Sequence, residues 1–154
     1  MFTDRKSPRI PGYDYAVPNY YFITICTDKH KYLFWTDRSL NQYGKIARDH
    51  MQKIADIYPG VEILMFVIMP NHVHLLIHIV GIFPPAGKIR SNTQNRISSF
   101  IGTFKRRVNR VCEENIWQYR SHDHVIRGQK DYVKIWEYIE NNPRKWMLDC
   151  FYKE

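Results

Sequence analysis

Hydrophobic runs along the chain predict a strand and a hairpin in its first half. Residues 20–26 are rich in β-branched and aromatic side chains, which is typical of a strand. Two further apolar runs, 62–69 and 72–80, are separated by Pro70-Asn71, a turn-forming pair. These two runs are therefore expected to pair as a hairpin.

Three other segments repeat hydrophobic residues at the spacing of an amphipathic helix. The first begins at Ser39, the expected N-cap, and stops before Pro59. The second spans 97–111, and the third spans 129–142, where Pro143 ends it. The second helix should leave four polar residues largely in solvent: Lys105, Arg106, Asn109 and Arg110.

A short run of mixed polarity at 123–127 supplies a fourth strand, so the order is β-α-β-β-α-β-α. We therefore expect an α+β fold of the ferredoxin-like, split βαβ type, with a four-stranded antiparallel sheet and an extra C-terminal helix. The length favours one domain over residues 1–154. Within it we expect a basic N-terminal arm at 1–18 and a flexible loop at 81–95, where proline, glycine and polar residues gather.

The charge of the chain indicates a polyanionic partner. Its 23 Lys and Arg exceed its 15 Asp and Glu, which gives a formal net charge of +8 and favours nucleic acid first and an anionic membrane second. The longest wholly apolar run, 63–69, is far shorter than the roughly 20 residues that span a bilayer, so no membrane partner is expected. The N-terminus shows no secretory signal, and the three cysteines form no CxxC pair, so we expect a cytoplasmic protein.

His72 and His74 are separated by one residue within a predicted strand. Side chains so spaced point to the same face, roughly 6 to 7 Å apart along the chain, and two such imidazoles can share a metal ion. A pair of this kind also occurs by chance, so taken alone it leaves a structural role and a metal role open. His78 lies on the same face but roughly 20 Å beyond His72, and we interpret it as an ordinary surface or core histidine.

Several motifs, taken in order along the chain, are more specific than the histidine pair. They are Gly12-Tyr13-Asp14-Tyr15, Tyr21-Phe22-Ile23-Thr24-Ile25-Cys26, the run Met69 to Ile77 around the histidines, Trp117-Gln118, and Tyr138-Ile139-Glu140-Asn141-Asn142-Pro143. Together they resemble the HUH single-tyrosine transposases, and specifically the REP-associated tyrosine transposases. The HUH element is histidine, a hydrophobic residue and histidine, as in His72-Val73-His74 here.

The resemblance implies which of the eleven tyrosines acts. In the family pattern the nucleophile lies in the last helix just before an asparagine-proline pair, which is Tyr138 in this chain. Asn142 follows four residues later on the same helical face, at the offset where related enzymes place an amide ligand. The implied site therefore has Tyr138 as the catalytic nucleophile and His72, His74 and Asn142 as ligands of Mg²⁺ or Mn²⁺. Many insertion-sequence relatives carry glutamine at this offset, where this chain has the shorter asparagine.

Tyr138 and Asn142 also allow a purely structural interpretation. A tyrosine in a terminal amphipathic helix often packs with a wet hydroxyl, and asparagine before proline often ends a helix. The histidines, in the family order, favour catalysis over this interpretation.

By the same resemblance, attack by Tyr138 on single-stranded DNA bearing a hairpin gives a 5′-phosphotyrosine and a free 3′-hydroxyl. The retained bond energy then allows transfer to a second strand. The alternative function is a non-catalytic protein that binds structured, repeat-hairpin DNA, and a third is a metal phosphodiesterase that uses water. A monomer and a homodimer are both left open.

Basic residues are expected to contact the DNA backbone, which gives salt-dependent affinity without reading the base sequence. An aromatic content of 15% also makes base stacking on an unpaired strand reasonable. The candidate DNA-binding residues lie in the arm, the second predicted helix and the segment that follows it: Arg5, Arg9, Lys105, Arg106, Arg110 and Arg120.

Overall fold

A four-stranded antiparallel sheet forms the centre of the fold. The computed structural model describes residues 20–58, 60–79 and 93–148. The strands are ordered β4-β5-β1-β6, so the first strand in sequence lies inside the sheet. Their bounds are β1 Tyr20–Cys26, β4 Val61–Met69, β5 His72–Ile79 and β6 His122–Val125. The predicted hairpin is confirmed as β4 and β5, and the split βαβ order is confirmed.

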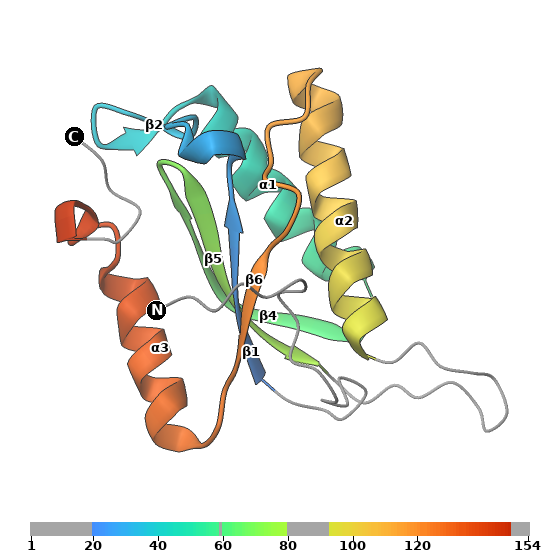
Figure 1. Ribbon diagram of the computed structural model, residues 1–154, viewed down its shortest axis with the longest axis vertical. Coiled ribbons are helices and arrows are strands. Elements are labelled where there is room, and N and C mark those ends of the chain that lie inside the picture. The colour runs from blue at the N-terminus through green and yellow to red at the C-terminus, as the bar shows by residue number, and fades with distance from the viewer. Residues whose placement is uncertain (1–19, 59, 80–92, 149–154) are drawn as a thin grey trace, which may run out of the picture.

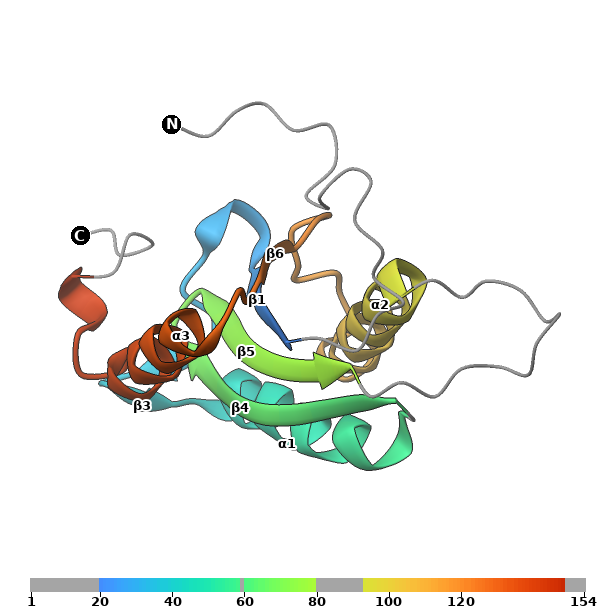
Figure 2. The same ribbon diagram turned by 90° about the horizontal axis from the view of Figure 1, so that it is seen from below.

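Helices cover both faces of this sheet. Helices α1 (Gln42–Ile57) and α2 (Thr93–Cys112) lie on one face, and α3 (Gln129–Asn141) lies on the other (Figure 1 and Figure 2). The extra C-terminal helix that the sequence predicts is therefore α3, and it carries Tyr138.

The two-residue period of a strand sorts the side chains of β1 and β5 between these layers. One set of alternate positions is buried in the main core with α1 and α2, and comprises Tyr21, Ile23, Ile25, Val73, Leu75 and Ile77. Thr24 and His74, which face each other across β1 and β5, belong to the other set and lie on the α3 side. Each large apolar side chain in the core contributes about 1.5–3 kcal/mol, so the core holds the register that places the polar residues.

The start of α1 differs from the prediction. Ser39 is not the N-cap, because it belongs to β3 (Ser39–Leu40), which pairs with β2 (Trp35–Thr36) in a small hairpin that the sequence pattern did not predict. The N-cap is Asn41, whose Oδ1 accepts a hydrogen bond from the backbone N–H of Gly44 at 3.0 Å.

Other boundaries move by a few residues. The third predicted helix ends at Asn141, so Asn142 is its C-cap. Residues 93–95 of the predicted loop 81–95 are helical, while the rest of that loop and the arm 1–18 lie outside the described residues. The remaining short elements are 3-10 helices at Asp28–His30 and Trp146–Leu148. No helix in the described part of the chain has the length and apolar character needed to cross a membrane.

We expect Asn41→Ala to lower the free energy of unfolding by about 1–2 kcal/mol, since the cap is lost together with a hydrogen bond from Asn41 Nδ2 to the Leu33 carbonyl at 2.9 Å. Ser39→Ala is the matched control and should change that free energy by less than about 0.5 kcal/mol. Urea denaturation followed by circular dichroism measures both. Equal losses in the two variants would contradict the assignment of Asn41 as the cap.

Candidate active site

The two histidines of β5 lie on the sheet face that α3 covers. His72 is 0% exposed and His74 is 2% exposed. Their rings tilt toward each other, so the two Nε2 atoms are only 2.9 Å apart. Two nitrogen lone pairs at this distance repel each other, and a proton or a cation between them makes the contact favourable.

Neighbouring side chains orient both rings. Nδ1 of His72 lies 2.7 Å from Oδ1 of Asn71, an oxygen that only accepts, so this nitrogen carries a proton. Nδ1 of His74 lies 2.9 Å from the hydroxyl of Thr24. In the tautomer where Nδ1 of both rings donates, each Nε2 atom keeps its lone pair, which is the form in which histidines bind a metal ion.

Burial sets the charge of His74. Desolvation, with the imidazole of His72 as the second cause, holds the pKa of His74 well below its usual range. His74 is therefore neutral at neutral pH. A neutral imidazole is the form that binds a metal ion.

The donor set fits a divalent cation. Two nitrogens that bind one ion at about 2.1 Å and at a right angle lie about 3 Å apart, and the observed 2.9 Å fits neighbouring positions on one six-coordinate ion. No third His, Cys, Asp or Glu joins the pair within residues 20–58, 60–79 and 93–148. Asn142, which supplies an amide oxygen, is 3% exposed. Asn142 lies in the chain between Tyr138 and Trp146. The ring of Tyr138 contacts His74, and the ring of Trp146 contacts His72.

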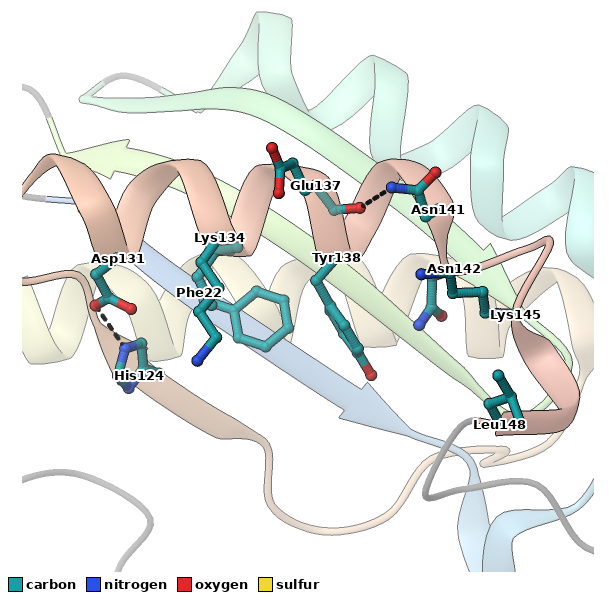
Figure 3. A pocket seen from close by; sticks show the side chains of 11 residues that line it. Phe22, His124, Asp131, Lys134, Glu137, Tyr138, Asn141, Asn142, Lys145 and Leu148 are labelled. Carbon is teal, nitrogen blue, oxygen red and sulfur yellow. Dashed lines mark hydrogen bonds and ion pairs between the residues drawn. The ribbon is translucent and has the colours of Figure 1, made fainter.

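Helix α3 places Tyr138 over the histidines. Its ring centroid is 5.3 Å from that of His74 and 6.0 Å from that of Phe22. Tyr138 is 40% exposed, so the phenol reaches both the buried pair and solvent. Figure 3 shows Tyr138 and Asn142 on the same side of α3, facing the sheet. The predicted nucleophile thus lies against one predicted histidine ligand, and Asn142 lines the same groove as Tyr138.

The predicted DNA contacts do not gather there. Arg106 and Arg110 are exposed on α2, on the opposite side of the sheet from α3 (Figure 1). Arg120 is exposed in the segment that leads to β6. Arg5 and Arg9 lie outside the described residues.

The sequence prediction was wrong for Lys105 and Asn109, which were expected largely in solvent. Nζ of Lys105 donates to the carbonyl of Gln118 at 2.8 Å, and burial lowers the pKa of this ammonium. Oδ1 of Asn109 accepts from the backbone N–H of Ile116 at 3.1 Å. Both side chains hold residues 113–121 against α2. Helical periodicity could not reveal this, because it does not report that the chain folds back on the helix.

Sequence reasoning missed three residues that shape the site. Thr24 bonds to His74, Phe22 lies with its ring centroid 4.9 Å from the same histidine, and Trp146 lies 5.9 Å from His72. Strand periodicity puts Thr24 and Phe22 on one face of β1, but which neighbours they meet depends on the pairing of β1 with β5. No local pattern points to Trp146.

The comparisons with known proteins show which family this chain belongs to. Residues 16–142 match the family model described as "Transposase IS200 like". The match covers more than half of the chain, so the chain belongs to the family of IS200-like transposases.

Three individual proteins are similar to this chain. An uncharacterized protein of Haemophilus influenzae is 33% identical over 96% of this chain and 93% of its own length. A second protein of Haemophilus influenzae, named "Putative REP-associated tyrosine transposase", is 28% identical over 86% of this chain and 74% of its own length. A solved structure of a REP-associated tyrosine transposase bound to a REP hairpin is similar in fold, with a TM-score of 0.60 and 25% identity, over 83% of this chain and 68% of that chain.

We expect Lys105→Met to lower the free energy of unfolding by about 1–2 kcal/mol, because the part-buried Gln118 carbonyl loses its donor. Arg110→Met, at an exposed position of the same helix, is the control and should cost less than about 0.5 kcal/mol. Urea denaturation of the two variants beside the unmodified protein makes the comparison. A Lys105 variant as stable as the Arg110 variant would show that Lys105 does not fasten the segment after α2.

Proposed function

We propose that this protein is a metal-dependent transposase that cleaves hairpin-bearing single-stranded DNA through a covalent tyrosine intermediate and transfers the strand. The observation that carries the proposal is the contact between Tyr138 and His74, which brings the phenol to a buried histidine pair in a chain of the transposase family.

Tyr138 is proposed as the nucleophile. Its oxygen attacks the phosphorus of a phosphodiester, the phenol proton passes to water, and the bond to the 3′-oxygen breaks while this oxygen takes up a proton from water. The products are a 5′-phosphotyrosine and a strand that ends in a 3′-hydroxyl. Because the new bond retains the energy of the old one, a second 3′-hydroxyl can attack it, restore the phenol and join two strands without another energy source.

His72, His74 and Asn142 are proposed to hold Mg²⁺ or Mn²⁺. Such an ion, when bound, polarises a non-bridging phosphate oxygen and offsets the charge that develops during attack. The protein residues supply its position: Thr24 and Asn71 fix the two imidazole rings.

Single-stranded DNA with a hairpin is the proposed substrate. The support is the solved relative bound to a REP hairpin, together with the net charge of +8. Contacts to DNA phosphates are proposed for Arg5, Arg9, Arg106, Arg110 and Arg120. Lys105 is less suited to this role, because its ammonium group is engaged by the Gln118 carbonyl. The proposed location of this activity is the cytoplasm, at the nucleoid, where its proposed DNA substrate lies.

Tyr138→Phe should abolish the covalent DNA adduct and leave hairpin affinity within about twofold, because the ring stays and only the attacking oxygen is removed. The test incubates the protein with hairpin-bearing single strands from the flanks of its own gene and Mg²⁺ or Mn²⁺. A denaturing gel and mass mapping then locate any adduct.

Tyr43→Phe is the matched control for this test. Tyr43 is 41% exposed, close to the 40% of Tyr138, and lies on α1 on the other side of the sheet. Its variant should form the adduct normally. Tight hairpin binding with no adduct under either metal would favour the non-catalytic DNA-binding alternative, while metal-dependent turnover without an adduct would favour a phosphodiesterase that uses water.

Thr24→Val should weaken Mn²⁺ binding by about tenfold, because the isosteric side chain no longer bonds to Nδ1 of His74. Thr103→Val is the control, because it removes a hydroxyl on α2 that donates to the Ser99 carbonyl and accepts from the Arg106 guanidinium, both within the same helix. Isothermal titration with Mn²⁺ after removal of bound metal by a chelator measures both affinities. Equal affinities in the two variants would argue against a metal role for the histidine pair.

A further inference from the structure

Helix α3 leaves part of the sheet face beside Tyr138 uncovered. The helix packs mainly on β4 and β5, so the β1 and β6 half of the same face stays open. Phe22 and His124, which face each other across β1 and β6, both line a groove there. The wall of the groove is α3, and Tyr138 is part of that wall (Figure 3).

The lining of this groove suits a nucleotide. Its volume of about 680 Å³ lies in the range of small-ligand sites. Phe22 is half-buried and offers an aromatic surface, while Lys134 on α3 offers a cation. Two carboxylates, of Asp131 and Glu137, and a second cation, Lys145, also line the groove. The carboxylate of Asp131 is engaged, since it bonds to Nε2 of His124 at 2.8 Å and accepts from the backbone N–H of Arg127 at 3.0 Å.

We propose that this groove binds an unpaired nucleotide next to the phosphate that Tyr138 attacks, with the base stacked on Phe22 and a backbone phosphate on Lys134. The inference rests on the proposed function, because a strand attacked by Tyr138 has to pass the groove that this phenol lines. Stacking on one aromatic ring tolerates any base, so the groove positions the strand without selecting its sequence.

The test compares two DNAs: the hairpin alone, and the hairpin with its unpaired flank. For the unmodified protein the flank should tighten binding. Phe22→Leu should lower affinity for the flanked DNA about tenfold and leave affinity for the bare hairpin unchanged. Lys134→Gln should reduce the slope of log Kd against log salt by about 1 for the flanked DNA only.

Matched variants separate stacking and charge from general damage. Phe66→Leu removes the same ring from β4, where Phe66 packs on the main core, and Lys130→Gln removes an exposed lysine of α3 that does not line the groove. Neither should alter the effect of the flank. Because the Phe22 ring also contacts His74, Phe22→Trp is added and should restore most of the lost affinity.

A fluorescent adenine analogue placed at each flank position reports stacking directly. The expected result is one position whose fluorescence is quenched on binding and recovers in Phe22→Leu. If the flank adds no affinity, or if Phe22→Leu and Phe66→Leu behave alike, the groove inference is overturned while an adduct on Tyr138 leaves the proposed function standing. Absence of both hairpin binding and adduct overturns the two together.

Discussion

The pairing of β1 with β5 is the constraint on which the rest of the site depends. Its register sets Thr24 opposite His74 and Cys26 opposite His72. The apolar residues that alternate with them hold this register against α1 and α2. A slip of one residue would turn both histidines into the apolar core and expose Leu75 to α3. Core packing and site geometry therefore favour the same register of β1 and β5. A change of register would disturb both the core and the site.

The position of α3 decides what the histidine pair can reach. A small second core, in which Ile135 and Ile139 pack with Leu76 of β5, fastens the helix to one half of the sheet face. This docking brings the Tyr138 ring against His74 and leaves the rest of the face open as a groove. These apolar contacts hold the helix on the sheet, while the side chain of Tyr138 keeps access to solvent.

Two of the candidate DNA-binding arginines lie apart from this site. The groove beside Tyr138 contains lysines and carboxylates together, whereas Arg106 and Arg110 are exposed on α2 across the sheet. Under the proposed function, the DNA meets two separate surfaces: the exposed arginines of α2 and the groove beside Tyr138. Net charge alone indicates the class of partner and does not indicate where that partner reacts.

Much of this could be predicted from the sequence, because periodicity is local. The two-residue period placed His72 and His74 on one face of a strand, and the helical period placed Tyr138 and Asn142 on one face of a helix. The order of the elements and the family motifs then gave the fold. Local patterns could not show that Lys105 is engaged by Gln118. They also could not find Thr24, which lies 50 residues from His74 in sequence. Only the tertiary structure decides these side-chain partners. The reason is that the contacting residues lie in different segments of the chain, and the fold brings those segments together.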